Sequence, residues 1–372
     1  MRVLRGLVAT PWGVMPDWQV EYQGGLLTYV GPERPATGVE TWEGVVSPGF
    51  LDTHIHGWGG VDVMEASARE MAQLSQTLAT MGVTGFLATL QTHAFTKTLE
   101  ALGALGRLPS LGGARLLGVH MEGPYLSPQR LGAQRPHPRQ PQPGDLESLL
   151  QHPHLKRITL APETTPKGFI EALNQHGVAV SAGHTQANYT QAMEAFEAGV
   201  GSVTHLWNAM VGIHHREPGI VGAALHHRGV LVELIGDCVH VHPPILGLTV
   251  RLKGPHRALL CSDGIPASGL PDGYHALHGR RFQVVDGVPR LETGGLAGGS
   301  VGLDEAVRRM VSRVGLEAWA ALVMASETPA RLLGLEDVGR LEAGRRADLV
   351  LLSPGLEVEE TVVGGRPVYR RG

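Results

Sequence analysis

Six side chains of the kinds that bind metal ions come at the ends of apolar, β-branched runs. These are His54, His56, Glu122, His184, His205 and Asp263. His54 and His56 share one run, and residues two apart in a strand point to the same side. A single histidine at such a position is usually structural. Four histidines and two carboxylates at the ends of five runs instead indicate a metal site.

Imidazole and carboxylate ligands suit divalent zinc, iron, cobalt or manganese. Such an ion lowers the pKa of bound water to about 7 and polarises a carbonyl oxygen, the two requirements for amide hydrolysis. A bridging carboxylate would allow a second ion about 3.5–4 Å from the first, so one or two ions are expected. Asp263 is placed to take a proton from the water and deliver it to the leaving amine. The alternative for Asp263 is a turn or helix-cap residue before Gly264.

The runs that carry these residues alternate with helical or Gly/Pro-rich segments. Eight such runs are predicted as strands: 49–56, 83–90, 115–122, 157–163, 177–184, 201–205, 230–237 and 257–263. Predicted helices include 66–81, 166–176, 188–198, 303–314 and 317–333. Buried strands alternating with helices indicate a (β/α)8 TIM-like barrel, in which the C-terminal strand ends converge on one active face.

The two ends of the chain have a different pattern. Residues 1–48 and 344–372 lack a helical pattern and consist of short strand-like segments and turns. We therefore expect both termini to form one small β-sandwich domain, with the hydrolase barrel at residues 49–343.

Composition excludes several classes of protein. The 372 residues carry 31 Lys+Arg against 35 Asp+Glu, a formal net charge of −4, which argues against a nucleic-acid partner. No stretch matches a signal peptide or a membrane helix, so a cytoplasmic protein without a membrane partner is expected. Cys238 and Cys261 lack zinc-ribbon spacing and are expected to be buried free thiols.

Several motifs resemble the amidohydrolase superfamily and, within it, the N-acetylglucosamine-6-phosphate deacetylase branch. The motifs are SPGFLDTHIHGWGG, GVHMEGPYLS, SAGHTQA, THLWNAM, DCVHVHP, LCSDGIPASG and the closing ETPARLLGL and ADLVLL segments. HMEGP, SAGHT and THLWNAM together are specific to that branch. The resemblance implies hydrolysis of N-acetyl-D-glucosamine 6-phosphate to D-glucosamine 6-phosphate and acetate, in amino-sugar catabolism or wall recycling.

The resemblance also implies roles for the metal-binding residues. Glu122, His184 and His205 would hold the principal ion, and Asp263 would be the general acid/base and touch the metal. Some family members replace both histidines of the first motif and keep a single ion. Because His54 and His56 are both present, a second ion bridged by Glu122 is expected.

Phosphate recognition is implied by a second set of residues. The backbone amides of Asn208 and Ala209, with Arg216 and His240, would bind the sugar phosphate. Arg216 would reach across the interface of a homodimer into the neighbouring site. Substrate would also be lined by Asp237 and by Leu296, Ala297 and Gly298.

One segment departs from the family. Where the family usually has a histidine, the run is Gly132-Ala133-Gln134, and Gln134 can donate a hydrogen bond but cannot become cationic. Ala133 and Gln134 are still expected to contact substrate, but the exact sugar stays open between the gluco and galacto epimers. The alternatives are another amidohydrolase, acting on a different N-acetyl hexosamine phosphate or on a cyclic amide, and a non-catalytic amidohydrolase-like binding protein. The phosphate-binding set argues against a cyclic amide, and the presence of all six ligands argues against a non-catalytic protein.

Overall fold

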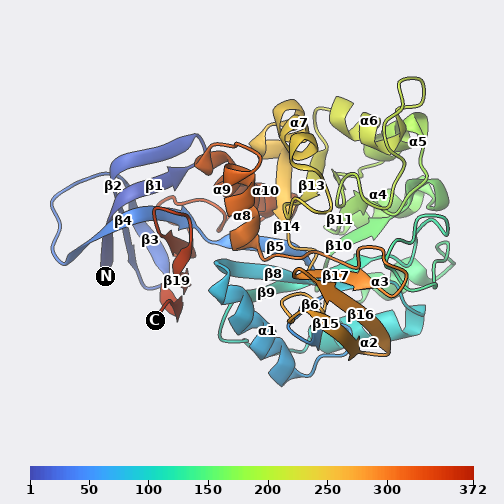
Figure 1. Ribbon diagram of the computed structural model, residues 1–372, viewed down its shortest axis with the longest axis horizontal. Coiled ribbons are helices and arrows are strands. Elements are labelled where there is room, and N and C mark those ends of the chain that lie inside the picture. The colour runs from blue at the N-terminus through green and yellow to red at the C-terminus, as the bar shows by residue number, and fades with distance from the viewer.

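The computed structural model describes residues 1–372, and its centre is a barrel of eight parallel strands (Figure 1). The strands are β5 (Phe50–Ile55), β8 (Val83–Leu90), β9 (Arg115–Glu122), β10 (Leu155–Leu160), β11 (Ala179–Ala182), β12 (Ser202–Val203), β13 (Leu231–Ile235) and β14 (Ala258–Cys261). They are hydrogen-bonded in chain order, and a parallel bridge from Ile55 to Gly264 joins the first strand to the segment after the last. All eight predicted strands are confirmed, and with them the (β/α)8 fold.

The barrel strands are apolar because both of their faces are covered. Every residue of β8 and of β13 is buried, as expected when side chains alternate between the bore and the surrounding helices. Those helices are α1 (Ala68–Thr80), α2 (Phe95–Leu105), α3 (Asp145–Leu150), α4 (Lys167–Gln175), α5 (Tyr189–Glu197), α6 (Gly219–His226), α7 (Pro243–Lys253), α8 (Leu303–Ser312), α9 (Ala318–Ala325) and α10 (Glu327–Leu332). None of them is long and apolar enough to cross a lipid bilayer.

Sequence signals set the starts of two of these helices. Ser67 accepts a hydrogen bond from the backbone N–H of Glu70, whose side chain accepts from the backbone N–H of Ser67, so α1 begins with a capping box. Asn188 and Gln191 make the same exchange at the start of α5. Short 3-10 turns, η1 (Pro162–Thr164) and η2 (Pro255–Arg257), precede α4 and β14.

Both termini build a separate sheet domain, seen at the left of Figure 1. Its strands are β1 (Arg2–Thr10), β2 (Gly13–Gln23), β3 (Leu26–Pro32), β4 (Val39–Pro48), β18 (Leu349–Leu352), β19 (Val358–Val363) and β20 (Arg366–Arg370). They are hydrogen-bonded in the order β20-β19-β18-β4-β1-β2-β3, so the two chain ends meet where β4 pairs with β18. The sheet has its own apolar core, which includes Leu4, Val20 and Leu349. The domain boundaries at residues 48 and 344 stay predictions.

The structure differs from the predicted elements in three places. An antiparallel sheet of β15 (Gly273–Leu277), β16 (Arg280–Val285) and β17 (Val288–Leu291) follows the last barrel strand, and the hairpin of β6 (Gly57–Trp58) and β7 (Val61–Asp62) follows the first. The helix predicted over 317–333 is two helices, α9 and α10. Their junction is Ser326, because Pro329 has no N–H to continue the first helix.

Candidate metal centre and its cavity

The predicted ligands lie together at the C-terminal ends of the barrel strands. Glu122 is the last residue of β9, and His184, His205 and Asp263 each come two residues after a strand. Those three residues have φ values of 48°, 31° and 47°. Left-handed backbone is rare for residues other than glycine and tends to mark functional sites. This turn of the backbone also explains why the strands end before the predicted ligands.

Glu122 joins two groups of ligand atoms. Its Oε1 lies 3.0 Å from Nε2 of His184 and 2.9 Å from Nε2 of His205, which are themselves 3.1 Å apart. Its Oε2 lies 3.1 Å from Nε2 of His56, and Nε2 of His56 lies 3.2 Å from Nε2 of His54. Each group of three offers donor atoms close enough to hold one ion. The carboxylate of Glu122 is the member that they share.

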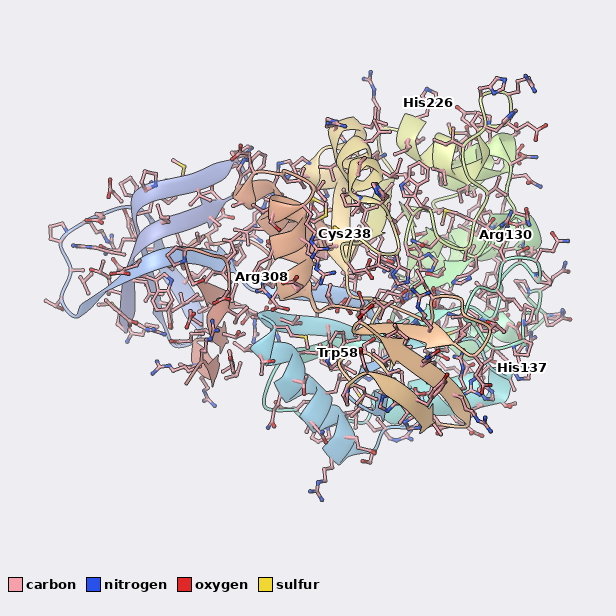
Figure 2. All side chains as sticks on the ribbon, viewed as in Figure 1. Trp58, Arg130, His137, His226, Cys238 and Arg308 are labelled. Atoms are coloured by element: carbon pink, nitrogen blue, oxygen red, sulfur yellow. The ribbon has the colours of Figure 1, made fainter.

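The tautomers of three histidines show that these donors fit a cation. In His54, His56 and His184, Nδ1 lies 2.8–3.1 Å from an acceptor, respectively the Glu233 carboxylate, the Thr89 carbonyl and the Arg130 carbonyl (Arg130 is labelled in Figure 2). A carbonyl or carboxylate oxygen accepts, so in the neutral rings Nδ1 carries the proton and Nε2 presents a lone pair. The lone pairs of His54 and His56 then face each other across 3.2 Å, which a bound divalent ion would stabilise.

The electrostatics of the ligand set also favour a positive charge at its centre. Burial opposes ionisation of Glu122, yet the imidazoles of His54 and His184 hold the pKa of its carboxyl well below the usual range. Burial lowers the pKa of His54, but the carboxylates of Glu122, Glu233 and Asp263 more than offset this and raise it well above the usual value. A bound metal cation would supply the positive charge that protonation of His54 otherwise brings to the site.

Asp263 sits at the edge of the ligand set. Its Oδ1 lies 3.4 Å from Nε2 of His54 and 3.6 Å from Nε2 of His56. The side chain is 14% exposed, against 2% for Glu122, so it can reach both a metal and a substrate. Backbone hydrogen bonds fix it from both sides, since its N–H donates to His54 and its carbonyl accepts from the N–H of Gly299. A Cβ at Gly299 would come 1.7 Å from the carbonyl oxygen of Ser262, so only glycine fits there.

A cavity of about 160 Å³ opens onto these ligands. Most of the residues predicted to touch substrate line it: Ala133, Gln134, Asn208, Ala209, His240, Leu296, Ala297 and Gly298. Gln91, Gly132 and Ile265 line it as well and were not among the predicted site residues, although Gly132 and Ile265 fall within segments quoted above. Five metal-binding residues also face the cavity, while His54 lies beneath them.

Asp237 does not line the cavity but positions a residue that does. Its carboxylate accepts from Nδ1 of His240 at 2.7 Å, from the backbone N–H of His240 and Val239 at 2.9 Å each, and from Oγ of Ser300 at 3.0 Å. Burial lowers the pKa of His240, but the hydrogen bond and charge of Asp237 raise it above the usual value. His240 is therefore held in one orientation and favoured as an imidazolium, the form that binds an anion.

Gln134 contacts the metal ligands directly. Its Nε2 donates to Oε2 of Glu122, and its Oε1 accepts from the backbone N–H of Thr92 at 2.8 Å. Arg280, from the unpredicted β16, donates to the carbonyl of Ala133 at 2.8 Å and to Oε1 of Gln91 at 3.2 Å. The added sheet thus supports the loop that carries Gln134.

Arg216, like Asp237, is a predicted site residue that lies outside the cavity. It is exposed, and its Nη1 lies 2.6 Å from Nε2 of its neighbour His215. Within one subunit the guanidinium does not reach the cavity, so its role in binding phosphate stays a prediction. Both cysteines are free thiols; Cys261 is buried, whereas Cys238 (labelled in Figure 2) is only partly buried.

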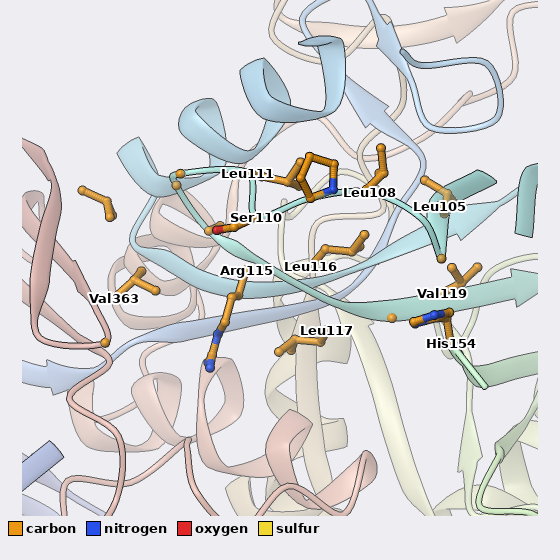
Figure 3. Close-up of a pocket in the computed structure, with 18 of the residues that line it drawn as sticks. Leu105, Leu108, Ser110, Leu111, Arg115, Leu116, Leu117, Val119, His154 and Val363 are labelled. Carbon is orange, nitrogen blue, oxygen red and sulfur yellow. The ribbon is translucent and has the colours of Figure 1, made fainter. Parts of the chain in front are cut away.

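A larger cavity lies elsewhere. It measures about 660 Å³ and lies between the start of β9 and the strands β19 and β20 of the terminal sheet (Figure 3). Leucine and valine side chains and arginines, among them Arg115 and Arg346, line it. None of the metal-binding residues faces it, so the chemistry belongs to the smaller cavity.

Comparison with known proteins agrees with this geometry. Residues 45–368 match the amidohydrolase family, a span that includes the whole barrel. The chain belongs to the amidohydrolase family. Two curated amidohydrolase relatives span nearly all of it: the N-acetylgalactosamine-6-phosphate deacetylase of Escherichia coli O157:H7, 37% identical over 98% of both chains, and the N-acetylglucosamine-6-phosphate deacetylase of Bacillus subtilis strain 168, 35% identical over 97% of this chain and 95% of the relative.

Solved structures of the same kind superpose on the whole amidohydrolase chain. A mutant N-acetyl-D-glucosamine-6-phosphate deacetylase from Mycobacterium smegmatis, in complex with N-acetyl-D-glucosamine 6-phosphate, is 34% identical with a TM-score of 0.93 and covers 99% of each chain. The enzyme from Thermotoga maritima is 34% identical with a TM-score of 0.89 and covers 99% of this chain and all of that one.

Proposed function

We propose that this chain hydrolyses N-acetyl-D-glucosamine 6-phosphate to D-glucosamine 6-phosphate and acetate, with a divalent metal held by the strand-end ligands. The observation that carries the proposal is the shared carboxylate of Glu122 between two groups of imidazole donors whose lone pairs converge. When bound there, a divalent ion of zinc, iron, cobalt or manganese lowers the pKa of a water and polarises the acetyl carbonyl.

Each of these residues has its own role in the proposed reaction. Glu122, His184 and His205 would hold the principal ion, and His54 and His56 would give the site the capacity for a second. Asp263 accepts a proton from the attacking water and delivers it to the nitrogen of the sugar as the C–N bond breaks. The proton balance closes, because the amide and one water give the amine and acetic acid, whose proton then passes to the amine to leave an ammonium group and acetate.

The same cavity also offers groups suited to a phosphate. They are the imidazole of His240, whose pKa Asp237 raises, and the backbone at Asn208 and Ala209, and all of them line the cavity. Arg216 would complete this site from a second subunit, since within its own subunit it is exposed and does not line the cavity. A homodimer with mutual exchange of Arg216 is therefore part of the proposal, as is a cytoplasmic location.

A panel of sugars tests the proposal. Acetate release is measured for N-acetylglucosamine 6-phosphate, N-acetylgalactosamine 6-phosphate and the two free sugars, and ring opening is measured for a cyclic amide. We expect acetate to be released from the phosphorylated sugars at least about 10-fold faster than from the free sugars. This factor is the effect of losing one charge-assisted contact. Equal rates with and without phosphate, or turnover of the cyclic amide alone, would contradict the assignment.

N-acetylgalactosamine 6-phosphate is the second candidate substrate. A relative named for that activity matches 98% of this chain at 37% identity, slightly more than the Bacillus relative named for the gluco epimer. The two sugars differ only at C4, so the ratio of their kcat/KM values in the same panel decides between them.

A further inference from the structure

A charged pair lies in the barrel bore beneath the metal ligands. Arg157 on β10 and Glu233 on β13 are both fully buried, and Nη1 of Arg157 donates to Oε2 of Glu233. Their strands are not neighbours in the sheet, so the pair crosses the interior of the barrel. Charged side chains are rarely buried completely, and buried pairs contribute little net stability compared with apolar residues of similar size. Packing alone therefore does not explain why this pair is present.

Glu233 contacts a ligand from each group of metal donors. Its Oε1 accepts from Nδ1 of His54 at 2.8 Å and from the backbone N–H of His205 at 3.1 Å. The first contact fixes the ring orientation of His54 and leaves its Nε2 lone pair toward the centre. The second holds the backbone of His205, where the chain leaves the strand with positive φ.

Arg157 contacts the residues that precede the same two ligands. Its Nη1 lies 3.3 Å from the carbonyl oxygen of Thr53, and its Nη2 lies 3.2 Å from Oγ1 of Thr204. Its Nε donates to Oγ of Ser181 at 3.0 Å. The guanidinium thus occupies the bore between these strands and, through Oε2, prevents Glu233 from turning away from His54.

We infer that the Arg157–Glu233 pair is a positioning device that sustains the second metal site, formed by His54, His56 and Glu122. Neither residue touches substrate. His54 has no other acceptor for Nδ1, whereas the ring of His184 in the principal site is held by the carbonyl of Arg130. Loss of the pair should therefore weaken the second ion much more than the principal one. The inference rests on the proposed metal centre.

Removing one partner alone would leave the other charge buried, so the variants remove both. In Arg157→Met/Glu233→Met the bore becomes apolar and His54 loses its acceptor, while Arg157→Met/Glu233→Gln keeps one oxygen that can accept from Nδ1. Lys253→Met is the matched control. It deletes another buried cation, whose Nζ contacts the carbonyls of Ala224 and His227 and no metal ligand.

Cobalt(II) binding to the metal-free proteins is followed by visible absorption and by metal analysis, with thermal unfolding as the check on folding. We expect the Met/Met variant to bind the first ion nearly as the wild type does and the second about 10- to 100-fold more weakly. The Met/Gln variant should recover part of that loss, and Lys253→Met should show none.

Three results would overturn the inference: two ions bound by the folded Met/Met variant with wild-type affinity, equal weakening of both ions, or a wild type that takes up only one. In each of these the principal metal centre survives. A wild type that binds no ion would instead refute the metal centre of the proposed function, and the inference with it.

Discussion

Replacing Asp237 with asparagine should remove the charge that favours the imidazolium form of His240. Burial alone would raise the pKa of Asp237, but the hydrogen bonds and charge of His240 and the backbone N–H groups bring it from 3.8 to about 2. At about 1.36 kcal/mol per pH unit, this difference corresponds to about 2 kcal/mol in favour of the ionised form. Asparagine cannot provide this stabilisation, so the pKa of His240 should fall.

The consequence is a change in selectivity and in pH dependence. If His240 binds the phosphate, Asp237→Asn should lower kcat/KM for the phosphorylated sugar about 10- to 100-fold at a pH where the wild type is fully active, the effect of one charge-assisted contact. The basic limb of its pH profile should move to lower pH, while the free sugar should lose much less.

Stability provides a second readout for the same variant. Because the folded pKa of Asp237 is depressed, its contribution is complete above about pH 4 and declines as the pH falls toward about 2. Urea unfolding at pH 7 should therefore show Asp237→Asn to be less stable by about 1–2 kcal/mol. Ser300→Ala is the control, since it removes one hydrogen bond and keeps the carboxylate. An unshifted pH profile, with equal losses on both sugars, would refute the reasoning.

Three further substitutions test the site. Asp263→Asn should keep its metal content while kcat falls by at least about 100-fold, the contribution of a general acid/base, and a variant with most of its kcat intact would show Asp263 to be structural. Glu122→Gln should lose more bound metal than any single histidine variant, because Glu122 serves both groups of donors; metal analysis after dialysis checks this, and full retention would contradict it. Arg216→Ala should depress kcat/KM for the phosphorylated sugar far more than for the free sugar. If Arg216 acts across the interface, mixed dimers of an Arg216→Ala subunit and an Asp263→Asn subunit should regain activity. Equal losses on both sugars would show Arg216 to be structural.

The barrel and its ligands could be predicted from sequence because both follow from local patterns. Buried parallel strands are apolar throughout, and a charged or imidazole side chain at the end of such a run is conspicuous, as with Glu122 at the end of β9. The strand ends converge by topology, so proximity of His54, His184 and Asp263 needed no knowledge of side-chain packing.

Other features depend on contacts between residues far apart in the chain. Arg157 and Glu233 are 76 positions apart, and each alone resembles an ordinary charged residue within a strand. Gln91 faces the cavity because its strand ends there, yet a glutamine carries no metal-site signal. The strands β15 to β17 contain no continuous buried apolar run, since they are half exposed and include Arg280 and Arg281. The role of Asp237 follows only from the hydrogen bonds that its carboxylate accepts from Val239, His240 and Ser300.

A metal held by Glu122, His184 and His205 should drive deacetylation of a phosphorylated amino sugar. The most direct test is to titrate zinc or cobalt into the chelated, metal-free protein and to measure acetate release from N-acetylglucosamine 6-phosphate at each metal-to-protein ratio. We expect negligible release without metal, a steep rise as the first ion is bound, and no such rise in Glu122→Gln. Undiminished acetate release by the metal-free protein would contradict the claim.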